Sequence, residues 1–214
     1  MSQTAAMPLP TLADVCRPVA AANSRVFDAL AIVAGIALVS ACAQVAVPMP
    51  SGVPITGQTF GVLLVGAVLG AKRGAMALAG YVALGLAGVP VLAMGHAGFP
   101  PATFGYLLGF VPAAFVVGLL AQRGWDRGRG IVGTLLAVAR TALAMTIGTL
   151  IIFALGIAWY ATVAMPLGWA GVTEMSGLLG ATLWPYLPGA VVKIALAMVV
   201  LPGAWKVVQK GRSA

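Results

Sequence analysis

Lys193 lies inside the apolar run Leu187–Val208, roughly 9 Å from its start if the run is helical. Ionisable side chains within membrane spans are costly and commonly mark substrate sites. Three interpretations are open. Lys193 forms an ion pair with Glu174 in the preceding segment, its long stem carries the charge to the outer membrane surface, or it faces an anionic or carbonyl-bearing ligand in a cavity.

The segment Val47–Thr59 is punctuated by prolines and leads directly into another apolar run. Proline excludes helix from its first half. Non-helical backbone at membrane depth is tolerated only where it is buried in protein or lines a cavity. Thr56, Gln58 and Thr59 are therefore candidate hydrogen-bonding contacts to a ligand. The alternative is a polar surface loop in which Thr56 caps the next helix.

The segment Gly95–Tyr106 carries the only histidine, His96, in a glycine-rich stretch that ends in the aromatic residues Phe104 and Tyr106. Flexible backbone and aromatic faces favour a lid over a flat ring. In the alternative interpretation His96 is merely exposed. The aromatic residues of the segment Thr162–Tyr186 could equally belong to an interfacial belt.

Catalytic and metal-binding patterns are missing from the sequence. It contains no phosphate-binding loop, no paired carboxylates and no zinc spacing, and Cys16 and Cys42 lie far apart. We therefore predict no catalytic residues, no metal and no cofactor. Any active transport would take its energy from another subunit.

The composition indicates that membrane-embedded segments position these residues. Hydrophobic residues make up 61% of the 214 positions and charged residues only 7%, against about 25% charged in soluble domains. The 12 basic residues outnumber 4 acidic ones, but they stand singly between apolar runs rather than forming a stripe. This pattern favours cytoplasmic anchoring of membrane loops over nucleic-acid binding.

A helical span needs about 17 to 25 apolar residues, and five segments satisfy this length. The sixth, Gln58–Ala71, would rise only about 21 Å as helix. The six predicted crossings are Phe27–Val47, Gln58–Ala71, Ala75–Met94, Phe104–Ala121, Thr141–Ala161 and Leu187–Val208.

The distribution of basic residues favours six crossings over five. With six, eleven of the twelve basic residues fall on one side, which is the cytoplasmic side by the positive-inside rule. We predict an all-α protein, a six-helix transmembrane bundle with N and C termini cytoplasmic. Residues 1–24 would form a flexible cytoplasmic tail and residues 25–214 a six-span domain. The eleven residues are Arg17, Arg25, Lys72, Arg73, Arg123, Arg127, Arg129, Arg140, Lys206, Lys210 and Arg212.

The run Ile131–Ala161 is too long for one perpendicular crossing and contains Arg140. A charge at mid-bilayer costs about 2.5 to 3.5 kcal/mol on insertion scales. We therefore predict that the crossing starts at Thr141 and that Ile131–Ala139 is an interfacial or coupling segment. A longer, strongly tilted helix is the alternative.

Small residues recur four apart in the first span, as Ala31 with Gly35 and Ala37 with Ala41. Such ridges permit close helix approach in lipid. They either pack within the chain's own bundle or contact a separate membrane partner.

A resemblance to a known family rests on the block Pro54–Gly70, on Tyr81, on Gly88–Leu92 and Thr103–Phe110, and on Tyr186–Lys193. These segments resemble BioY-type proteins, the substrate-binding S components of energy-coupling factor (ECF) biotin transporters. The resemblance implies a six-helix subunit that holds biotin in an outward-facing pocket. It also implies a transmembrane T component and two ATPase subunits as partners, and a multi-pass location in the plasma (inner) membrane.

Together with the residues above, the resemblance gives nine candidate substrate contacts: Thr56, Gln58, Thr59, Tyr81, His96, Phe104, Tyr106, Ala190 and Lys193. The family's last helix reads Pro-Gly-Asp with Lys three residues later; the Lys matches Lys193, and Ala190 replaces the Asp. Ala102 and Phe104 depart from the family's Pro-Thr-Gly-Gly-Tyr. An S component for another vitamin, a self-sufficient secondary carrier and a structural scaffold are the alternatives.

Overall fold

The computed structural model describes residues 8–17 and 24–212, and within them helices dominate. The all-α prediction is confirmed, apart from one antiparallel pair, β1 (Ala46–Val47) and β2 (Ile55–Thr56), in which Ala46 pairs with Thr56. The longer helices are α2 (Ser24–Gln44), α3 (Gln58–Leu69), α4 (Ala71–Leu86), α5 (Phe104–Gln122), α6 (Gly130–Trp159) and α8 (Leu187–Arg212). The shorter helical elements are α1 (Leu12–Val15), η1 (Ala93–Gly95), η2 (Tyr160–Ala164), η3 (Met175–Gly177), α7 (Leu178–Thr182) and η4 (Trp184–Tyr186).

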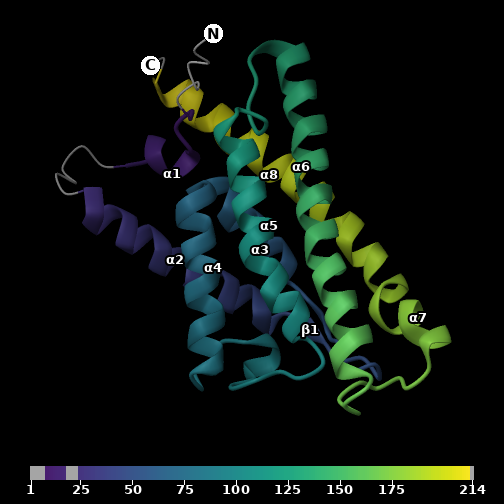
Figure 1. Cartoon of the computed structure of the whole chain (residues 1–214). Coiled ribbons are helices and arrows are strands. Elements are labelled where there is room, and N and C mark those ends of the chain that lie inside the picture. The colour runs from purple at the N-terminus through teal and green to yellow at the C-terminus, as the bar shows by residue number, and fades with distance from the viewer. Residues whose placement is uncertain (1–7, 18–23, 213–214) are drawn as a thin grey trace, which may run out of the picture.

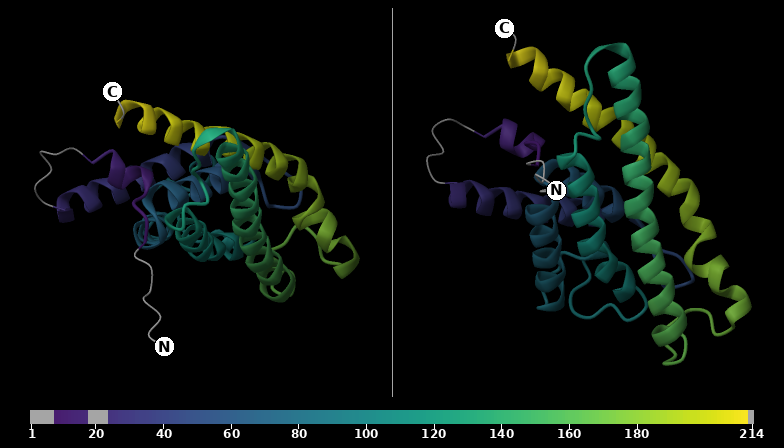
Figure 2. Two further views of the ribbon diagram at one scale, coloured as in Figure 1. Left: turned by 90° about the horizontal axis from the view of Figure 1, so that it is seen from above. Right: turned by 45° about the horizontal axis from the view of Figure 1, so that its top comes forward.

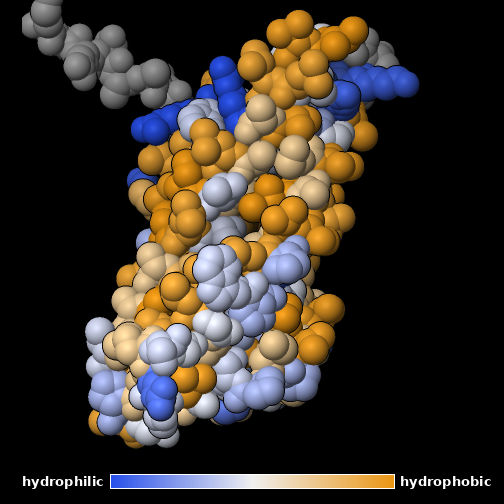
Figure 3. All heavy atoms as spheres, turned by 90° about the vertical axis from the view of Figure 1, so that its right-hand side faces the viewer, coloured by the Kyte–Doolittle hydropathy of each residue, from blue (hydrophilic) through white to orange (hydrophobic). Residues whose placement is uncertain are grey.

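Four helical stretches of the described chain are long and apolar enough to cross a membrane: Arg25–Gln44, Phe104–Gln122, Gly130–Ala164 and Met175–Lys210. The chain is therefore a multi-pass membrane protein. Helix α3 is apolar but has only 12 residues. Hydrophobic side chains cover most of the length of the molecule on the face in Figure 3, and the most hydrophilic side chains gather toward its two ends.

The predicted span Ala75–Met94 is wrong at both ends. Helix α4 starts at Ala71 and stops at Leu86. Gly88 follows with φ +95°, a left-handed conformation that glycine adopts readily, and its N–H donates to the carbonyl of Gly85. Pro90 then prevents the helix from continuing. The residues up to Met94 are thereby freed for the loop that covers one end of the molecule.

Ile131–Ala139 is not a separate interfacial element, because α6 is one continuous helix of 30 residues. No proline interrupts it between Gly130 and Trp159. At 1.5 Å per residue it is about 45 Å long, which exceeds the roughly 30 Å hydrocarbon core. The alternative of a longer helix is the one that the structure adopts. Arg140 is exposed on its surface.

Figures 1 and 2 show α6 and α8 as a long antiparallel pair beside a compact group formed by α3, α4 and α5. Helix α2 runs obliquely across α3 and α4. One end of the molecule gathers α1, the α5–α6 connection and the C-terminal end of α8. The other end gathers the hairpin, α7 and the loop that follows α4 (Figure 1).

Glycines allow α3, α4 and α5 to touch through their backbones. A Cβ atom built on Gly66 of α3 would lie 2.5 Å from the carbonyl oxygen of Ala114 in α5, and one built on Gly118 of α5 would collide with the backbone of Ala71. Close backbone contact of this kind holds helices together in lipid, where the hydrophobic effect does not act between them. These three helices therefore form the tightly packed part of the fold.

Residues 8–17, which belong to the predicted tail, lie against the bundle. The guanidinium group of Arg73 donates to Asp14 at 2.6 Å and to Asp28 at 3.1 Å. Burial alone would raise the pKa of Asp14, but hydrogen bonds from Thr11 and Arg73 outweigh burial and lower it. This network ties the N-terminal segment and the start of α2 to the start of α4. Residues 1–7 and 18–23 of the predicted tail lie outside the described residues.

Replacing Gly66 by Ala tests the close contact between α3 and α5. The added methyl group meets backbone, which cannot move aside as a side chain can, so we expect a loss of about 1 to 3 kcal/mol of stability. Gly203→Ala in α8 is the matched control, because nothing lies within 4 Å of a Cβ at that position. Thermal unfolding in detergent, followed by circular dichroism, measures both variants. Equal midpoints for the two variants would contradict the contact.

Candidate ligand-binding site

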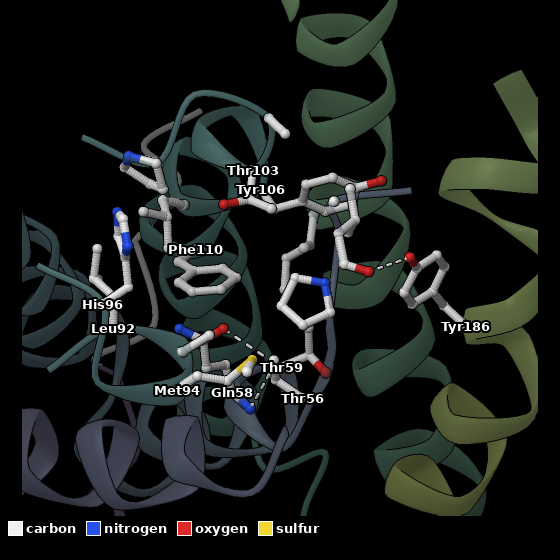
Figure 4. Close-up of a pocket in the computed structure, with 18 of the residues that line it drawn as sticks. Thr56, Gln58, Thr59, Leu92, Met94, His96, Thr103, Tyr106, Phe110 and Tyr186 are labelled. Carbon is white, nitrogen blue, oxygen red and sulfur yellow. Dashed lines mark hydrogen bonds between the residues drawn. The ribbon is translucent and has the colours of Figure 1, made fainter. Parts of the chain in front are cut away.

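A cavity of about 610 Å³ lies at the end of the molecule that carries the hairpin and the loop after α4. This volume is in the range of small-molecule sites. Its walls come from the hairpin loop, α3, the loop 92–103, α5, α6 and α8 (Figure 4). Apolar and aromatic side chains form most of the surface, among them Leu92, Tyr106, Phe110, Ile152 and Phe153.

Lys193 lines this cavity, and its Nζ donates to Thr59 Oγ1 at 2.8 Å. The predicted alternative of an ion pair with Glu174 is not formed: Glu174 is exposed and accepts a hydrogen bond from Ser176. Glu174 is also absent from the cavity wall. Among the described residues, Lys193 is therefore the charged side chain of a cavity whose lining contains no carboxylate.

Thr56, Gln58 and Tyr81 form a short hydrogen-bonded chain beside the cavity. Thr56 Oγ1 donates to Gln58 Oε1 at 3.1 Å, and Gln58 Nε2 donates to the Tyr81 hydroxyl at 2.6 Å. Tyr81 itself donates to the carbonyl of Val91 at 3.1 Å. Tyr81 is fully buried and does not line the cavity. It orients the Gln58 amide and ties it to Val91, in the loop that follows α4.

His96 lines the cavity from the loop 92–103 and is exposed to solvent. The backbone of Met94 has φ +59°, a left-handed conformation that is uncommon for residues other than glycine. A hydrogen bond from His96 N–H to Ala93 closes this tight turn, and Gln44 donates to the carbonyl of Leu92 at 3.3 Å. The loop is thereby held over the cavity.

Phe104 does not line the cavity. Its ring packs against Phe99 and Trp159, with ring centroids 4.9 and 5.0 Å apart. The Trp159 indole donates to the carbonyl of Pro101 at 2.8 Å. These contacts fasten the end of the covering loop to α6, so Phe104 acts on the site through the loop.

Seven of the nine predicted contact residues line the cavity: Thr56, Gln58, Thr59, His96, Tyr106, Ala190 and Lys193. They come from four separate stretches of the sequence: residues 56–59, His96, Tyr106 and residues 190–193. Tyr81 and Phe104 lie behind the wall. The sequence did not point to Thr149 and Phe153 of α6, because nothing in an unbroken apolar helix shows which side faces the cavity.

Two buried tyrosines fix the hairpin loop to the other wall and a third holds α7, and sequence reasoning missed their role. Tyr160 donates to the carbonyl of Ser51 at 2.9 Å, and Tyr186 bonds to Ser51 Oγ at 3.1 Å and to the carbonyl of Val53. Tyr106 donates to the carbonyl of Thr182 at 3.0 Å. Tyr186 also lines the cavity, so it is not an interfacial aromatic (Figure 4).

The small residues of α2 divide between two faces. A Cβ on Gly35 would lie 3.1 Å from Ala77 of α4, and Ala31 is partly buried against the core. Of the two alternatives, packing within the bundle therefore holds for these two residues and contact with a partner does not. Ala37 and Ala41 are exposed on a different side of α2.

The arrangement suits a neutral or anionic small molecule. One ammonium group stands at the α3–α8 wall, neutral hydrogen-bonding groups lie beside it, and aromatic rings line the rest. In residues 8–17 and 24–212, no three His, Cys, Asp or Glu side chains lie close enough to hold a metal ion. The site is therefore built for binding by hydrogen bonds, one charge and apolar contact.

Comparison with known proteins places the chain in a family. Residues 17–210 match the BioY family. The biotin transporter BioY of Rhodobacter capsulatus is 37% identical over 167 residues, which cover 72% of this chain and 80% of that protein. The BioY of Rhizobium etli is 36% identical over 148 residues, which cover 68% and 74%.

A solved structure shares the fold. The crystal structure of the S-component for biotin from an ECF-type ABC transporter matches with a TM-score of 0.65 and 20% identity, over 90% of this chain and 94% of that one. Because the family match spans nearly the whole sequence and the relatives exceed 30% identity, this chain belongs to the BioY family.

Proposed function

We propose that this chain is the substrate-binding subunit of a biotin uptake system, and that it captures biotin in the cavity around Lys193. The observation that carries this proposal is the unneutralised Lys193 ammonium group in a cavity otherwise lined by neutral and aromatic groups. Biotin transporters of the same family support the choice of ligand.

Biotin offers a carboxylate and a fused ring with a neutral ureido group, and each has a counterpart in the cavity. The carboxylate fits Lys193 and Thr59, since a charged hydrogen bond contributes about 1.5 to 3 kcal/mol. The ureido group fits the amide and hydroxyl groups of Gln58 and Thr56. The ring fits the apolar walls, including Phe110.

We also propose six crossings with both termini in the cytoplasm. Arg73 at the start of α4 bonds to Asp28 at the start of α2, so these two starts lie at the same end of the molecule. Since α2 crosses away from that end, α3 must return the chain to it. Lys72 then joins the other basic residues on one side, as the positive-inside rule requires.

An S component needs an energy source, and we propose a transmembrane T component with two ATPase subunits in the plasma (inner) membrane. The sequence lacks a phosphate-binding loop of its own. Ala37 and Ala41 present small side chains outward from α2 and are the proposed contact for a partner helix.

Lys193→Met tests the proposed ligand contact. We expect the variant to fold, since it removes a charge from the membrane interior, and to bind biotin at least about tenfold more weakly. Titration calorimetry on the purified chain measures the affinity, and Glu174→Gln is the control that should bind as the parent does. Parental affinity in Lys193→Met would remove Lys193 from the site. Tight binding of another vitamin but not biotin would favour the alternative substrate.

Single cysteines at Ala97 and Lys72 test the topology, in a chain whose Cys16 and Cys42 have been replaced. Both positions are exposed. In intact cells, an impermeant maleimide should label Ala97→Cys, whereas Lys72→Cys should react only after the membrane is opened. Labelling of Lys72→Cys from outside would contradict the crossing by α3.

Ala37→Leu and Ala41→Leu test the partner contact. Because both side chains point away from the bundle, we expect uptake of labelled biotin to fall while binding to the purified chain is unchanged. Val33→Leu, on an exposed position of the same helix, is the control for added bulk. A parallel loss of binding and uptake would instead assign these alanines to packing within the chain.

A further inference from the structure

A second groove, of about 830 Å³, lies at the end of the molecule opposite the biotin site. The α5–α6 connection, the first turns of α6 and the last turns of α8 form it. Lys206 in this groove is 13 residues after Lys193 on the same helix, which is roughly 20 Å. The groove is lined by Gly128, Arg129, Gly130, Ile131, Thr134, Leu135, Lys206, Gln209 and Lys210.

The groove carries positive charge from both of its walls. Arg129 stands at the start of α6, and Lys206 and Lys210 stand on α8. In the described part of the chain, no acidic residue lines it. The neighbouring carboxylate, Asp126, is buried and engaged by the Trp205 indole at 2.6 Å and by Arg127 at 2.9 Å. The positive charge of the groove is therefore not offset by Asp126.

The same groove also has an apolar part that is open to its surroundings. Ile131 is 82% exposed and Leu135 is 64% exposed, and both line it. A site for free phosphate or nucleic acid gains nothing from such side chains, and a site for an apolar helix gains nothing from three cations. A ligand that satisfies both parts has an anionic head and a hydrocarbon chain.

The position of the groove fits this ligand. Helix α6 is about 15 Å longer than the hydrocarbon core is thick, so its first turns reach the level of the lipid headgroups. Given the topology proposed above, that level belongs to the cytoplasmic leaflet, where basic pockets between membrane helices bind anionic headgroups. We propose that the α6–α8 groove binds an anionic phospholipid, with its phosphate at Arg129 and Lys206 and an acyl chain along Ile131 and Leu135.

The wall of the groove is preformed rather than assembled on binding. A Cβ on Gly128 would collide with the carbonyl of Gly133, so the connection folds tightly back on the first turn of α6. The Arg127 guanidinium lies 3.7 Å from the centre of the Trp205 ring and donates to the carbonyl of Ala121 at 2.9 Å. These contacts hold Arg129 beside α8.

Native mass spectrometry of the detergent-purified full chain tests the proposal, with dioleoyl phosphatidylglycerol and dioleoyl phosphatidylcholine as probes. We expect the affinity of the parent for phosphatidylglycerol to exceed its affinity for phosphatidylcholine by about tenfold or more. Arg129→Gln/Lys206→Gln should lose this preference. The matched control is Lys72→Gln/Arg123→Gln, which removes two exposed charges that do not line the groove. Absence of the preference in the parent, or its equal loss in the control, overturns the proposal.

Two further measurements distinguish binding of a lipid in the groove from binding of free phosphate. Leu135→Asn should weaken retention of phosphatidylglycerol, and millimolar inorganic phosphate should leave it unchanged. If inorganic phosphate displaces phosphatidylglycerol and Leu135→Asn has no effect, the groove binds a soluble anion, and the proposal of a lipid site is overturned. Biotin affinity is measured on every variant. It should stay parental throughout, so a failure here is distinct from a failure of the biotin site.

Discussion

The charge on Lys193 is the constraint around which the ligand-binding end of the molecule is organised. An ammonium group in an apolar helix needs a polar surrounding within reach of its stem. Thr59 supplies one hydrogen bond at 2.8 Å, because the hairpin leads directly into α3 and places Thr59 in its first turn. Non-helical backbone of this kind is stable in a membrane only when protein covers it. The tyrosines that hold Ser51 and Val53 provide the cover, so the charge, the hairpin and the buried hydroxyl groups depend on one another.

The two halves of the bundle serve this arrangement differently. Helices α3, α4 and α5 meet through glycines such as Gly66 and Gly118, and backbone contact at that range leaves little freedom to shift. Helices α6 and α8 are longer and expose much of their apolar surface. The rigid half therefore fixes Gln58 and Thr59, while the long pair carries Lys193 at one end and the basic groove at the other. In our proposals, ligand and lipid bind at opposite ends of the same two helices.

The sequence predicted which segments form helices better than it predicted the residues at which those helices begin and end. Long apolar runs identify membrane helices because few other structures satisfy the backbone in lipid, and each predicted span overlaps one observed helix. The residues at which the helices end depend on local backbone and side-chain chemistry, which a hydropathy average does not report. Gly88 and Pro90 end α4 early, whereas Arg140 fails to break α6 because an exposed arginine on a long helix can reach the membrane surface. The contacts of Tyr160 and Tyr186 with Ser51 span 109 and 135 residues, and no pattern in one sequence reveals pairings at that separation.

Ala190 leaves the proposed site without a carboxylate one turn before Lys193. The family pattern places Asp at this position, one turn before Lys193, where it would neutralise the lysine directly. Here a methyl group lines the cavity instead, and Thr59 offers the lysine a neutral partner. A hydrogen bond to a hydroxyl group compensates desolvation only partly, so the charge remains available to an anion that enters. In the proposed site the ureido end of biotin meets neutral groups, and the hydrogen-bonded chain from Thr56 through Gln58 to Tyr81 is the oriented set beside the cavity. We therefore expect affinity in this chain to depend more on the carboxylate end of the ligand than it would with an aspartate at position 190.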